Sequence, residues 1–288
     1  MTGSQGQLGT DLVAYLSTGR EVIGIEKQDV DIRSFSKLLE TFRAVEPEWV
    51  IHTAAYTDVD GAEANPGLAQ AVNADGTENV ARAATKVGAK LLYYSTDYVF
   101  DGAKELPYVE TDLPNPQTVY GKSKFDGEER VKSWVDNYVI MRIGWVYGQH
   151  GKNFVKTMVK LGREQTLKGS GVQAGPPILV VNDQFGNPTW TMDIASQTKV
   201  VLEAGLFGIF HATSERPTSW YQFAKDLFSS LNIPASVQPC GSDQYVRPAK
   251  RPRNSALENQ RLKEAGIHIM RPYDTALAEF LALHGENL

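Results

Sequence analysis

The chain has 288 residues, of which 42% are hydrophobic and 22% charged, so it can bury a substantial core as one large domain or two smaller ones. Its net charge of −5 lacks the basic character of a nucleic-acid-binding protein, and its single cysteine, Cys240, excludes an intramolecular disulfide and a cysteine-rich zinc site. We find neither a signal peptide nor the roughly 18 consecutive apolar residues of a membrane helix, and therefore expect a cytoplasmic protein without membrane contact.

Short apolar runs alternate with amphipathic stretches over the first 150 residues. The pattern predicts four strands and a helix over residues 67–87. The predicted strands are residues 21–25 (EVIGI), 49–53 (WVIHT), 91–95 (LLYYS) and 138–143 (YVIMRI). This repetition predicts an α/β fold with a doubly wound, Rossmann-like parallel sheet covered by helices on both faces. Such sheets bind ligands at the carboxyl ends of their strands.

The alternation is looser beyond about residue 150. Residues 167–177 are rich in Gly and Pro and predict a mobile loop, whereas residues 178–181 predict a short strand and residues 220–231 an amphipathic helix. Neither a clear linker nor an internal repeat marks a boundary. We therefore expect a dinucleotide-binding domain at residues 1–150 and a smaller C-terminal substrate-binding lobe at residues 151–288, partly interleaved with the first.

A glycine-rich turn lies at the start of the chain and leads directly into a predicted helix. Its sequence GSQGQLG lets backbone N–H groups approach a diphosphate, whose charge the helix N-terminus favours. Glu26 follows 23 residues after Gly3, where an acid can bind ribose hydroxyls, and Asp31 and Ile32 offer a carboxylate and an apolar surface to an adenine. The loop residues expected to face this cofactor are Gly3, Gln5, Gly6, Gln7, Leu8 and Gly9. A plain strand-to-helix turn is the alternative interpretation.

The strand that should precede this turn is almost missing. Only Met1 and Thr2 stand before Gly3, although a dinucleotide-binding fold needs its central strand there. Two interpretations stay open: the start of the sequence is misassigned or engineered, or cofactor binding is compromised.

Tyr120 and Lys124 form a Y-x-x-x-K pattern. Residues four apart share one face of a helix, so the phenol and the ammonium can point into the same cleft. A nearby cation favours the phenolate and brings the tyrosine closer to useful proton transfer. An incidental pair on a surface helix is the alternative. Thr96, at the carboxyl end of a predicted strand 24 residues upstream, favours catalysis because its hydroxyl can bond a substrate carbonyl.

A glycine loop, a strand-end hydroxyl and Y-x-x-x-K in this order resemble the extended short-chain dehydrogenases/reductases, and further motifs narrow the resemblance to the dTDP-4-dehydrorhamnose reductases. These motifs are GQLG (6–9), HTAAYTDVDGAE (52–63), AVNADGTENVA (71–81), STDYVFDG (95–102), RIGWVYG (142–148), NDQFGNPT (182–189) and RPRNSAL (251–257). Related nucleotide-sugar 4,6-dehydratases carry Thr-Asp-Glu, with a glutamate that helps to eliminate water. This chain has Thr96-Asp97-Tyr98 instead, which favours a reductase.

The resemblance implies a reaction and its catalytic residues. A dTDP-linked 6-deoxy-4-keto sugar would be reduced at C4 to dTDP-L-rhamnose with NADPH or NADH as the cofactor. Tyr120 would donate the proton, Thr96 would bond the same oxygen, and Lys124 would lower the pKa of the tyrosine and hold the nicotinamide ribose. Glu26 disfavours a 2′-phosphate and Lys27 offsets it, so we expect use of both cofactors, leaning to NADH.

The resemblance also implies binding residues. Ala54, Ala55 and Thr57 would line the cofactor site, and Asn73 would brace that loop. The residues expected to contact the nucleotide sugar are Thr96, Asp97, Tyr98, Trp145, Asn182, Gln184, Thr189, Arg251 and Asn254. Three alternatives stay open: Trp145 as a core residue, residues 182–189 as a structural turn, and the basic residues 247–253 as a solvated loop.

Other function classes remain as alternatives. One is a reductase or epimerase that acts on a different nucleotide sugar, and another is a non-catalytic regulatory subunit of the same fold. The five histidines show no pair at metal-ligand spacing, so no metal site is expected, and a homodimer is left open.

Overall fold

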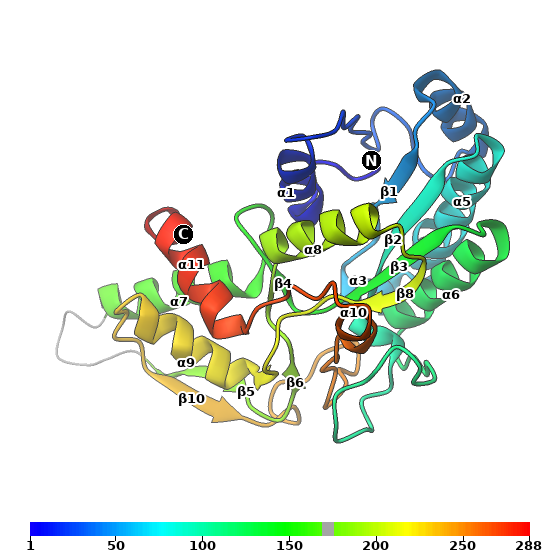
Figure 1. Cartoon of the computed structure of the whole chain (residues 1–288). Helices are drawn as coiled ribbons and strands as arrows, with labels where there is room; N and C mark the ends of the chain where they lie inside the picture. Colours follow the sequence, from blue (N-terminus) through cyan, green and yellow to red (C-terminus); the bar gives the residue numbers. More distant parts are fainter. Residues whose placement is uncertain (169–175) are drawn as a thin grey trace.

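The computed structural model describes residues 1–168 and 176–288 (Figure 1). Its centre is a parallel four-stranded sheet in the order β1-β2-β3-β8, which confirms the predicted fold class. The strands are β1 (Trp49–His52), β2 (Lys90–Thr96), β3 (Tyr138–Ile143) and β8 (Gly208–His211). The first three coincide with predicted strands. Most of the predicted loop over residues 167–177 lies outside the described residues.

Helices cover both faces of this sheet, as a doubly wound fold requires (Figure 1). One face carries α1 (Gln7–Leu16) and α8 (Thr191–Ala204). The other face carries α2 (Phe35–Val45), α5 (Thr77–Lys86) and α6 (Val119–Trp134). The predicted helix over residues 67–87 consists of α4 (Pro66–Gln70), a π-helical segment η1 (Ala71–Gly76) and α5.

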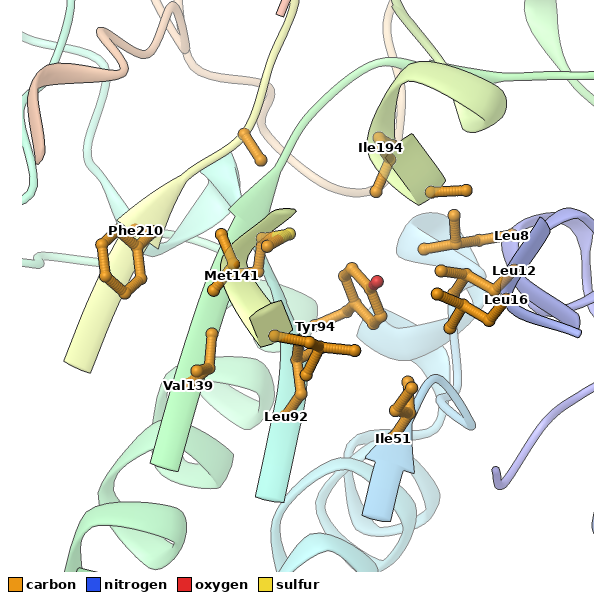
Figure 2. Packing of buried hydrophobic residues seen from close by; sticks show 14 of the residues in the cluster. Leu8, Leu12, Leu16, Ile51, Leu92, Tyr94, Val139, Met141, Ile194 and Phe210 are labelled. Carbon is orange, nitrogen blue, oxygen red and sulfur yellow. The ribbon is translucent and has the colours of Figure 1, made fainter. Parts of the chain in front are cut away.

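Alternating side chains of the central strands fill the two cores, because neighbouring residues of a strand point to opposite faces. Leu92 and Tyr94 of β2 pack on the side of α1 and α8, whereas Leu91 and Tyr93 pack on the side of α2 and α5. Figure 2 shows the first cluster, in which Tyr94 and Leu92 lie between the leucines of α1 (Leu8, Leu12 and Leu16) and the β3 residues Val139 and Met141. Both faces are buried, so the strands contain almost continuous apolar runs.

The predicted strand over residues 21–25 is wrong in its extent. Within the described residues only Ile25 pairs there, in a single parallel bridge with Thr2, which also pairs with His52. Thr2 thus lies between two neighbours, and its N–H donates to the carbonyl of Ile51 at 3.0 Å. Residues 21–24 form no ladder within the described residues, where this run pairs only through Ile25. A cavity of about 410 Å³ lies beside Met1, between residues 20–25 and β1.

The second half of the chain supplies a separate core. Its strands are short pairs: β4 (Val146–Tyr147) with β7 (Thr189–Trp190), β5 (Ile178–Val181) with β10 (Val237–Cys240), and β6 (Phe185–Gly186) with β9 (Thr218–Ser219). Its helices are α7 (Phe154–Lys168), α9 (Trp220–Ser230), α11 (Tyr273–His284) and the short η3 (Gly285–Asn287). Helix α10 (Gln260–Glu264) packs on the main sheet instead, where Leu262 joins the first core cluster. Strand β5 and helix α9 match the predicted elements. Because α8 and β8 return to the main sheet, the two halves interleave along the chain.

Candidate active site

A cleft of about 1050 Å³ runs along the carboxyl ends of β1, β2 and β3. It brings together most of the predicted site residues from distant parts of the sequence. Those lining it are Gly3, Gly6, Gln7, Leu8, Gly9, Glu26, Asp31, Ile32, Ala54, Ala55, Thr57, Thr96, Asp97, Tyr98, Tyr120, Lys124 and Trp145. Sequence reasoning missed Tyr56, Val59, Leu68, Val72, Gly144 and Lys152, which also line it. Tyr56 and Val59 follow Ala54 and Ala55 in the same motif, so the motif itself could have indicated them.

The glycine loop is packed too tightly for side chains. A Cβ at Gly9 would lie 2.0 Å from the carbonyl oxygen of Gly3, and one at Gly3 would lie 2.8 Å from the backbone nitrogen of Ala54. Gly3 also has a φ of 70°, which favours glycine. Helix α1 begins directly after Gly6, and its first N–H groups are available to an anion. The loop therefore has the form of a diphosphate cradle.

Glu26 is tied to this loop. Its Oε1 accepts hydrogen bonds from Ser4 Oγ at 2.9 Å and from the backbone N–H of Gln5 at 2.6 Å. Gln5 itself is exposed outside the cleft lining, so its backbone serves the loop by holding Glu26. Farther along the same wall, the Arg33 guanidinium hydrogen-bonds Asp31 and lowers the pKa of that carboxyl to about 2.

Tyr120 and Lys124 share one face of α6, as predicted. The side chain of Thr118 caps the helix by accepting the N–H of Gly121 at 3.0 Å, which places Tyr120 in the first turn. Burial raises the pKa of Tyr120 to about 12, with a smaller raising effect from Asp97, and the Thr96 hydroxyl works in the opposite direction. Lys124 is not among the groups that shift this pKa, and desolvation is its largest cause.

Lys124 is buried at the bottom of the cleft. Its Nζ donates to the carbonyl of Tyr94 at 2.6 Å and lies 4.1 Å from the ring centroid of Tyr93. Burial lowers the pKa of Lys124 to about 7, although Glu128, one turn farther along α6, acts to raise it. The ammonium is thus close to its titration point at neutral pH.

Thr96 and Asp97 end β2 directly beside the tyrosine. Thr96 Oγ1 donates to Asp97 Oδ1 at 3.0 Å, and the N–H of Tyr98 donates to Thr96 Oγ1 at 3.2 Å. Asp97 is 2% exposed, its Oδ2 has no hydrogen-bond partner among the described residues, and burial raises its pKa to about 6. A buried carboxyl with a raised pKa therefore belongs to the cleft lining.

Trp145 lies in the cleft wall and is not a fully buried core residue. Its φ of 47° is in the left-handed region, which a bulky side chain rarely adopts. Its ring stacks on Trp220 with centroids 3.4 Å apart and planes 2° apart, and its Nε1 donates to Ser255 Oγ at 3.2 Å. The backbone strain is held by contacts from the second half of the chain.

The other predicted sugar contacts lie outside the cleft lining. Asn182 accepts a hydrogen bond from Ser219, Gln184 donates to Ser242, and Thr189 donates to the carbonyl of Asn187. Arg251 forms a two-point ion pair with Asp60, and Asn254 donates to the carbonyl of Lys104 at 2.8 Å. These interactions connect segments of the protein to one another, and the roles of these residues toward a substrate stay predictions.

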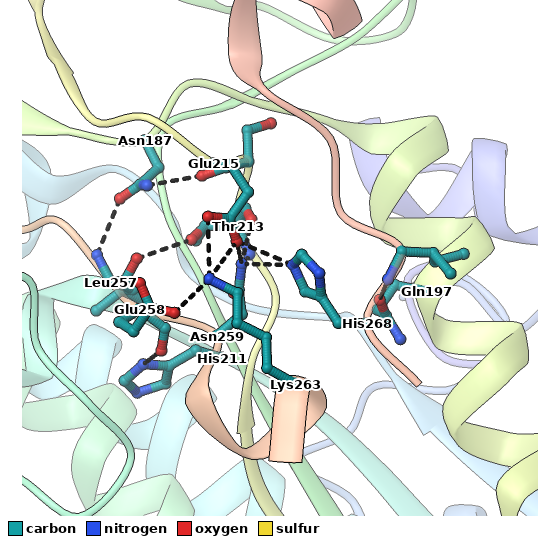
Figure 3. A network of polar contacts seen from close by, with 12 residues as sticks. Asn187, Gln197, His211, Thr213, Glu215, Leu257, Glu258, Asn259, Lys263 and His268 are labelled. Carbon is teal, nitrogen blue, oxygen red and sulfur yellow. Dashed lines mark hydrogen bonds and ion pairs between the residues drawn. The ribbon is translucent and has the colours of Figure 1, made fainter. Parts of the chain in front are cut away.

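A polar network connects separate segments of the second half of the chain (Figure 3). The amide of Asn187 donates to the carbonyl of Ser214 at 2.7 Å and accepts the N–H of Leu257 at 2.9 Å. Asn259 donates to Glu215 Oε1 at 2.9 Å, and His268 is paired with the same carboxylate. The motifs NDQFGNPT and RPRNSAL thus meet at this junction, which supports a structural role for parts of both.

The described residues contain neither a membrane-spanning helix nor a metal-binding cluster. None of their helices is long and apolar enough to cross a membrane. In the same part of the chain, no group of three or more His, Cys, Asp or Glu side chains is arranged to hold a metal ion.

The doubly wound sheet, the glycine cradle and the Tyr120–Lys124 pair at the carboxyl edge define an extended short-chain dehydrogenase/reductase. Over residues 1–285 the chain matches the family described as the RmlD substrate binding domain. It is 39% identical to a dTDP-4-dehydrorhamnose reductase of Streptomyces griseus, over 99% of this chain and 93% of that protein. The chain belongs to the dTDP-4-dehydrorhamnose reductase family.

Two further comparisons refine this result. The chain is 35% identical to a dTDP-4-keto-6-deoxy-D-glucose reductase of Streptomyces niveus, over 98% of this chain and 96% of that protein. A dTDP-4-dehydrorhamnose reductase of Bacillus anthracis, solved in complex with NADP, has a TM-score of 0.92 and 37% identity, with 98% of this chain and 97% of that chain covered.

Proposed function

We propose that the protein reduces the C4 keto group of dTDP-4-dehydro-L-rhamnose with NADPH or NADH to give dTDP-L-rhamnose. One observation carries the proposal: Thr96, Tyr120 and Lys124 meet the glycine loop in a single cleft at the carboxyl edge of the sheet. The names of the family relatives support the same reaction.

The residues present fit a dinucleotide cofactor. Gly3 and Gly9 allow the loop backbone to pack closely on itself and on Ala54, which a Cβ at either position would prevent, and helix α1 begins at this loop. Ile32 offers an apolar wall to the adenine, and Glu26 keeps Oε2 for a ribose hydroxyl while Oε1 holds the loop. When bound, the cofactor supplies the hydride that adds to C4.

Tyr120 supplies the proton that completes the reduction. The carbonyl oxygen gains negative charge as C4 is reduced, and the phenol O–H transfers its proton to that oxygen to form the alcohol. The raised pKa keeps Tyr120 protonated at neutral pH, which is the form that a proton donor needs. Thr96 bonds the same oxygen, and the Lys124 ammonium stabilises the phenolate that remains.

The other end of the substrate would lie along the second half of the chain. Trp145 would contact the sugar ring, and Arg251 would meet the diphosphate by releasing Asp60, since a guanidinium binds phosphate well. Residues 151–288 other than α8 and β8 would form the substrate lobe. Tyr98 supports reduction over elimination, because this position has no carboxylate to assist loss of water.

The test is oxidation of NADPH by purified protein in the presence of dTDP-4-dehydro-L-rhamnose, with the sugar product identified by NMR. Tyr120→Phe is expected to lower kcat by at least about a thousandfold while the dissociation constant for NADPH stays within about threefold. Tyr147→Phe is the matched control, because its hydroxyl is buried outside the cleft lining and has no partner among the described residues. Undiminished turnover in Tyr120→Phe would remove this residue from its role.

A second substrate is favoured by one specific finding, the 35% identity to the reductase of dTDP-4-keto-6-deoxy-D-glucose. Parallel assays with both sugars decide between them by the ratio of kcat/KM. Titrations with NADPH and with NADH measure cofactor choice. Glu26 opposes a 2′-phosphate, and Lys27 attracts it. A preference for NADPH over NADH above roughly 30-fold, about 2 kcal/mol, would contradict our expectation of dual use.

A further inference from the structure

A continuous chain of buried hydrogen bonds connects Thr2, directly before the glycine loop, to the helix that carries Tyr120 and Lys124. Thr2 Oγ1 lies 2.7 Å from His52 Nδ1, and His52 Nε2 lies 3.0 Å from Thr77 Oγ1. Thr77 Oγ1 donates to the carbonyl of Asn73 at 2.7 Å. Thr2, His52, Thr77 and Asn73 are each at most 1% exposed. The chain therefore runs entirely through the protein interior.

The remaining hydrogen bonds of this series reach Tyr120. Asn73 Nδ2 donates to Ser123 Oγ at 2.9 Å, and Ser123 Oγ donates to the carbonyl of Tyr120 at 2.8 Å. Asn73 also exchanges two hydrogen bonds with the backbone of Tyr56, which lines the cleft. It does so from the π-helical segment η1, an irregularity that is common at functional sites.

The hydrogen bond from Thr77 to the carbonyl of Asn73 favours one order of the protons along these hydrogen bonds. A hydroxyl has a single proton, and that of Thr77 goes to the carbonyl of Asn73, so Thr77 accepts from His52. His52 Nε2 must then carry a hydrogen. Burial and the nearby Lys124 lower the pKa of His52 to about 3, so the ring is neutral and its Nδ1 accepts from Thr2.

We propose that His52, as its neutral Nε2–H tautomer, is a positioning residue that holds the start of the glycine loop in register with the helix that carries Tyr120 and Lys124. Thr2 is followed directly by Gly3, and Ser123 is bonded to Tyr120 within the first turn of α6. The chain thus joins the two parts of the site that must face each other across C4. This inference rests on the proposed reductase function.

The positioning role follows from what lies at the two ends of this series of hydrogen bonds. Cofactor affinity depends on the cradle and the adenosine wall, which the chain does not form. The distance between nicotinamide and Tyr120 depends on how α6 sits against the glycine loop, and a displacement of about 1 Å there can cost about a hundredfold in rate. Breaking the chain is therefore expected to lower kcat much more than cofactor affinity.

The first experiment reads the proton order and needs no substrate. In protein labelled with ¹⁵N-histidine, the ring signals of His52, assigned with His52→Asn, should show hydrogen on Nε2 only and no titration between about pH 6 and about pH 8. A hydrogen on Nδ1, or a charged ring, would overturn the proposal.

The second experiment breaks the chain at Thr77. Thr77→Val keeps the shape and removes the hydroxyl, and is expected to lower kcat at least about tenfold while the dissociation constant for NADPH stays within about threefold. Thr77→Ser restores the hydroxyl and should bring kcat back to within about threefold. Thr198→Val is the matched control, since Thr198 is equally buried and also donates to the carbonyl four residues earlier.

Three results would overturn the positioning role: kcat of Thr77→Val within threefold of wild type, no recovery in Thr77→Ser, or an equal loss in Thr198→Val. A global loss of folding would appear as weakened NADPH binding in Thr77→Val, which also counts against it. Wild-type protein that binds NADPH but turns over neither sugar would contradict the proposed function instead, and the ¹⁵N signals would then decide on the proton order alone.

Discussion

Replacement of Gly9 by alanine tests the glycine cradle most directly. The new Cβ would lie 2.0 Å from the carbonyl oxygen of Gly3 and 2.9 Å from the Cα of Ser4. Real Cβ contacts are essentially never shorter than 3.0 Å, so the first distance must grow by about 1 Å. Both neighbours are backbone atoms, and therefore the loop itself has to move, because no flexible side chain can yield.

The size of the effect follows from this geometry. Overpacking of a tight contact costs about 1–3 kcal/mol, and each 1.4 kcal/mol corresponds to a factor of ten in a binding constant. Since the moving backbone carries the N–H groups proposed to bind the diphosphate, we expect NADPH to bind about 10- to 100-fold more weakly to Gly9→Ala. The same strain should lower the melting temperature by several degrees, at about 2–4 °C per kcal/mol for a chain of this size.

The assay is a titration of protein with NADPH followed by cofactor fluorescence, with thermal unfolding of the same samples. Gly6→Ala should have a smaller effect, because its Cβ would lie 3.3 Å from the same carbonyl. Gly19→Ala serves as the control, since no atom lies within 4 Å of its Cβ in the described structure. Binding by Gly9→Ala within threefold of wild type, or equal losses in all three variants, would refute the cradle.

Three further predictions concern ionisable groups in or behind the cleft. Because burial lowers the pKa of Lys124 to about 7, its ammonium is lost as the pH rises through that value, and kcat/KM should fall above about pH 7; a flat profile to about pH 9 would contradict this. Burial raises the pKa of Asp97 from 3.8 to about 6, so the folded state holds this proton more tightly and stability declines as the pH rises through that window. The free energy of unfolding of Asp97→Asn, measured with urea, should therefore rise relative to that of wild type by up to about 3 kcal/mol between about pH 4 and about pH 7. A difference that does not depend on pH would count against the raised pKa of Asp97. The buried guanidinium of Arg142 donates to the Glu128 carboxylate at 2.9 and 2.7 Å, and Glu128→Gln removes that charge. The free energy of unfolding in denaturant should fall by about 3–5 kcal/mol, whereas a fall below about 1 kcal/mol would show that the pair contributes little.

Features that depend on local spacing were predictable from the sequence. Tyr120 and Lys124 are four residues apart and share a helix face, and the apolar runs of β2 and β3 coincide with strands because both sheet faces are buried. The glycine loop was also predictable, because its pattern of glycines is local in the sequence. Its spacing placed Gly3 and Gly9 correctly on the cleft wall.

Features that depend on distant partners were not predictable in this way. Residues 21–24 have strand-like composition, yet a strand requires a neighbour along its whole length, and Met1 and Thr2 provide pairing at one position. Arg251 carries a charge suited to a diphosphate, but Asp60, 191 residues earlier, holds it in this structure. The direction of the Tyr120 pKa shift likewise depends on how deeply tertiary packing buries the ring.

Departures from ordinary local geometry collect around the cleft. Gly3 and Trp145 have positive φ, Asn73 lies in a π-helical segment, and Asp97 is a buried carboxyl with an unpaired oxygen. The positive φ of Trp145 is unfavourable by itself and persists because contacts with Trp220 and Ser255 hold the side chain. Positive φ also occurs at Glu46, Arg216 and Asn232 outside the cleft lining, whereas the buried ionisable side chains of Lys124 and Asp97 belong to that lining, which supports catalysis. A non-catalytic protein of this fold would be expected to lose the buried Lys124 and Asp97 first, since each lowers stability when it is charged and has no chemical task.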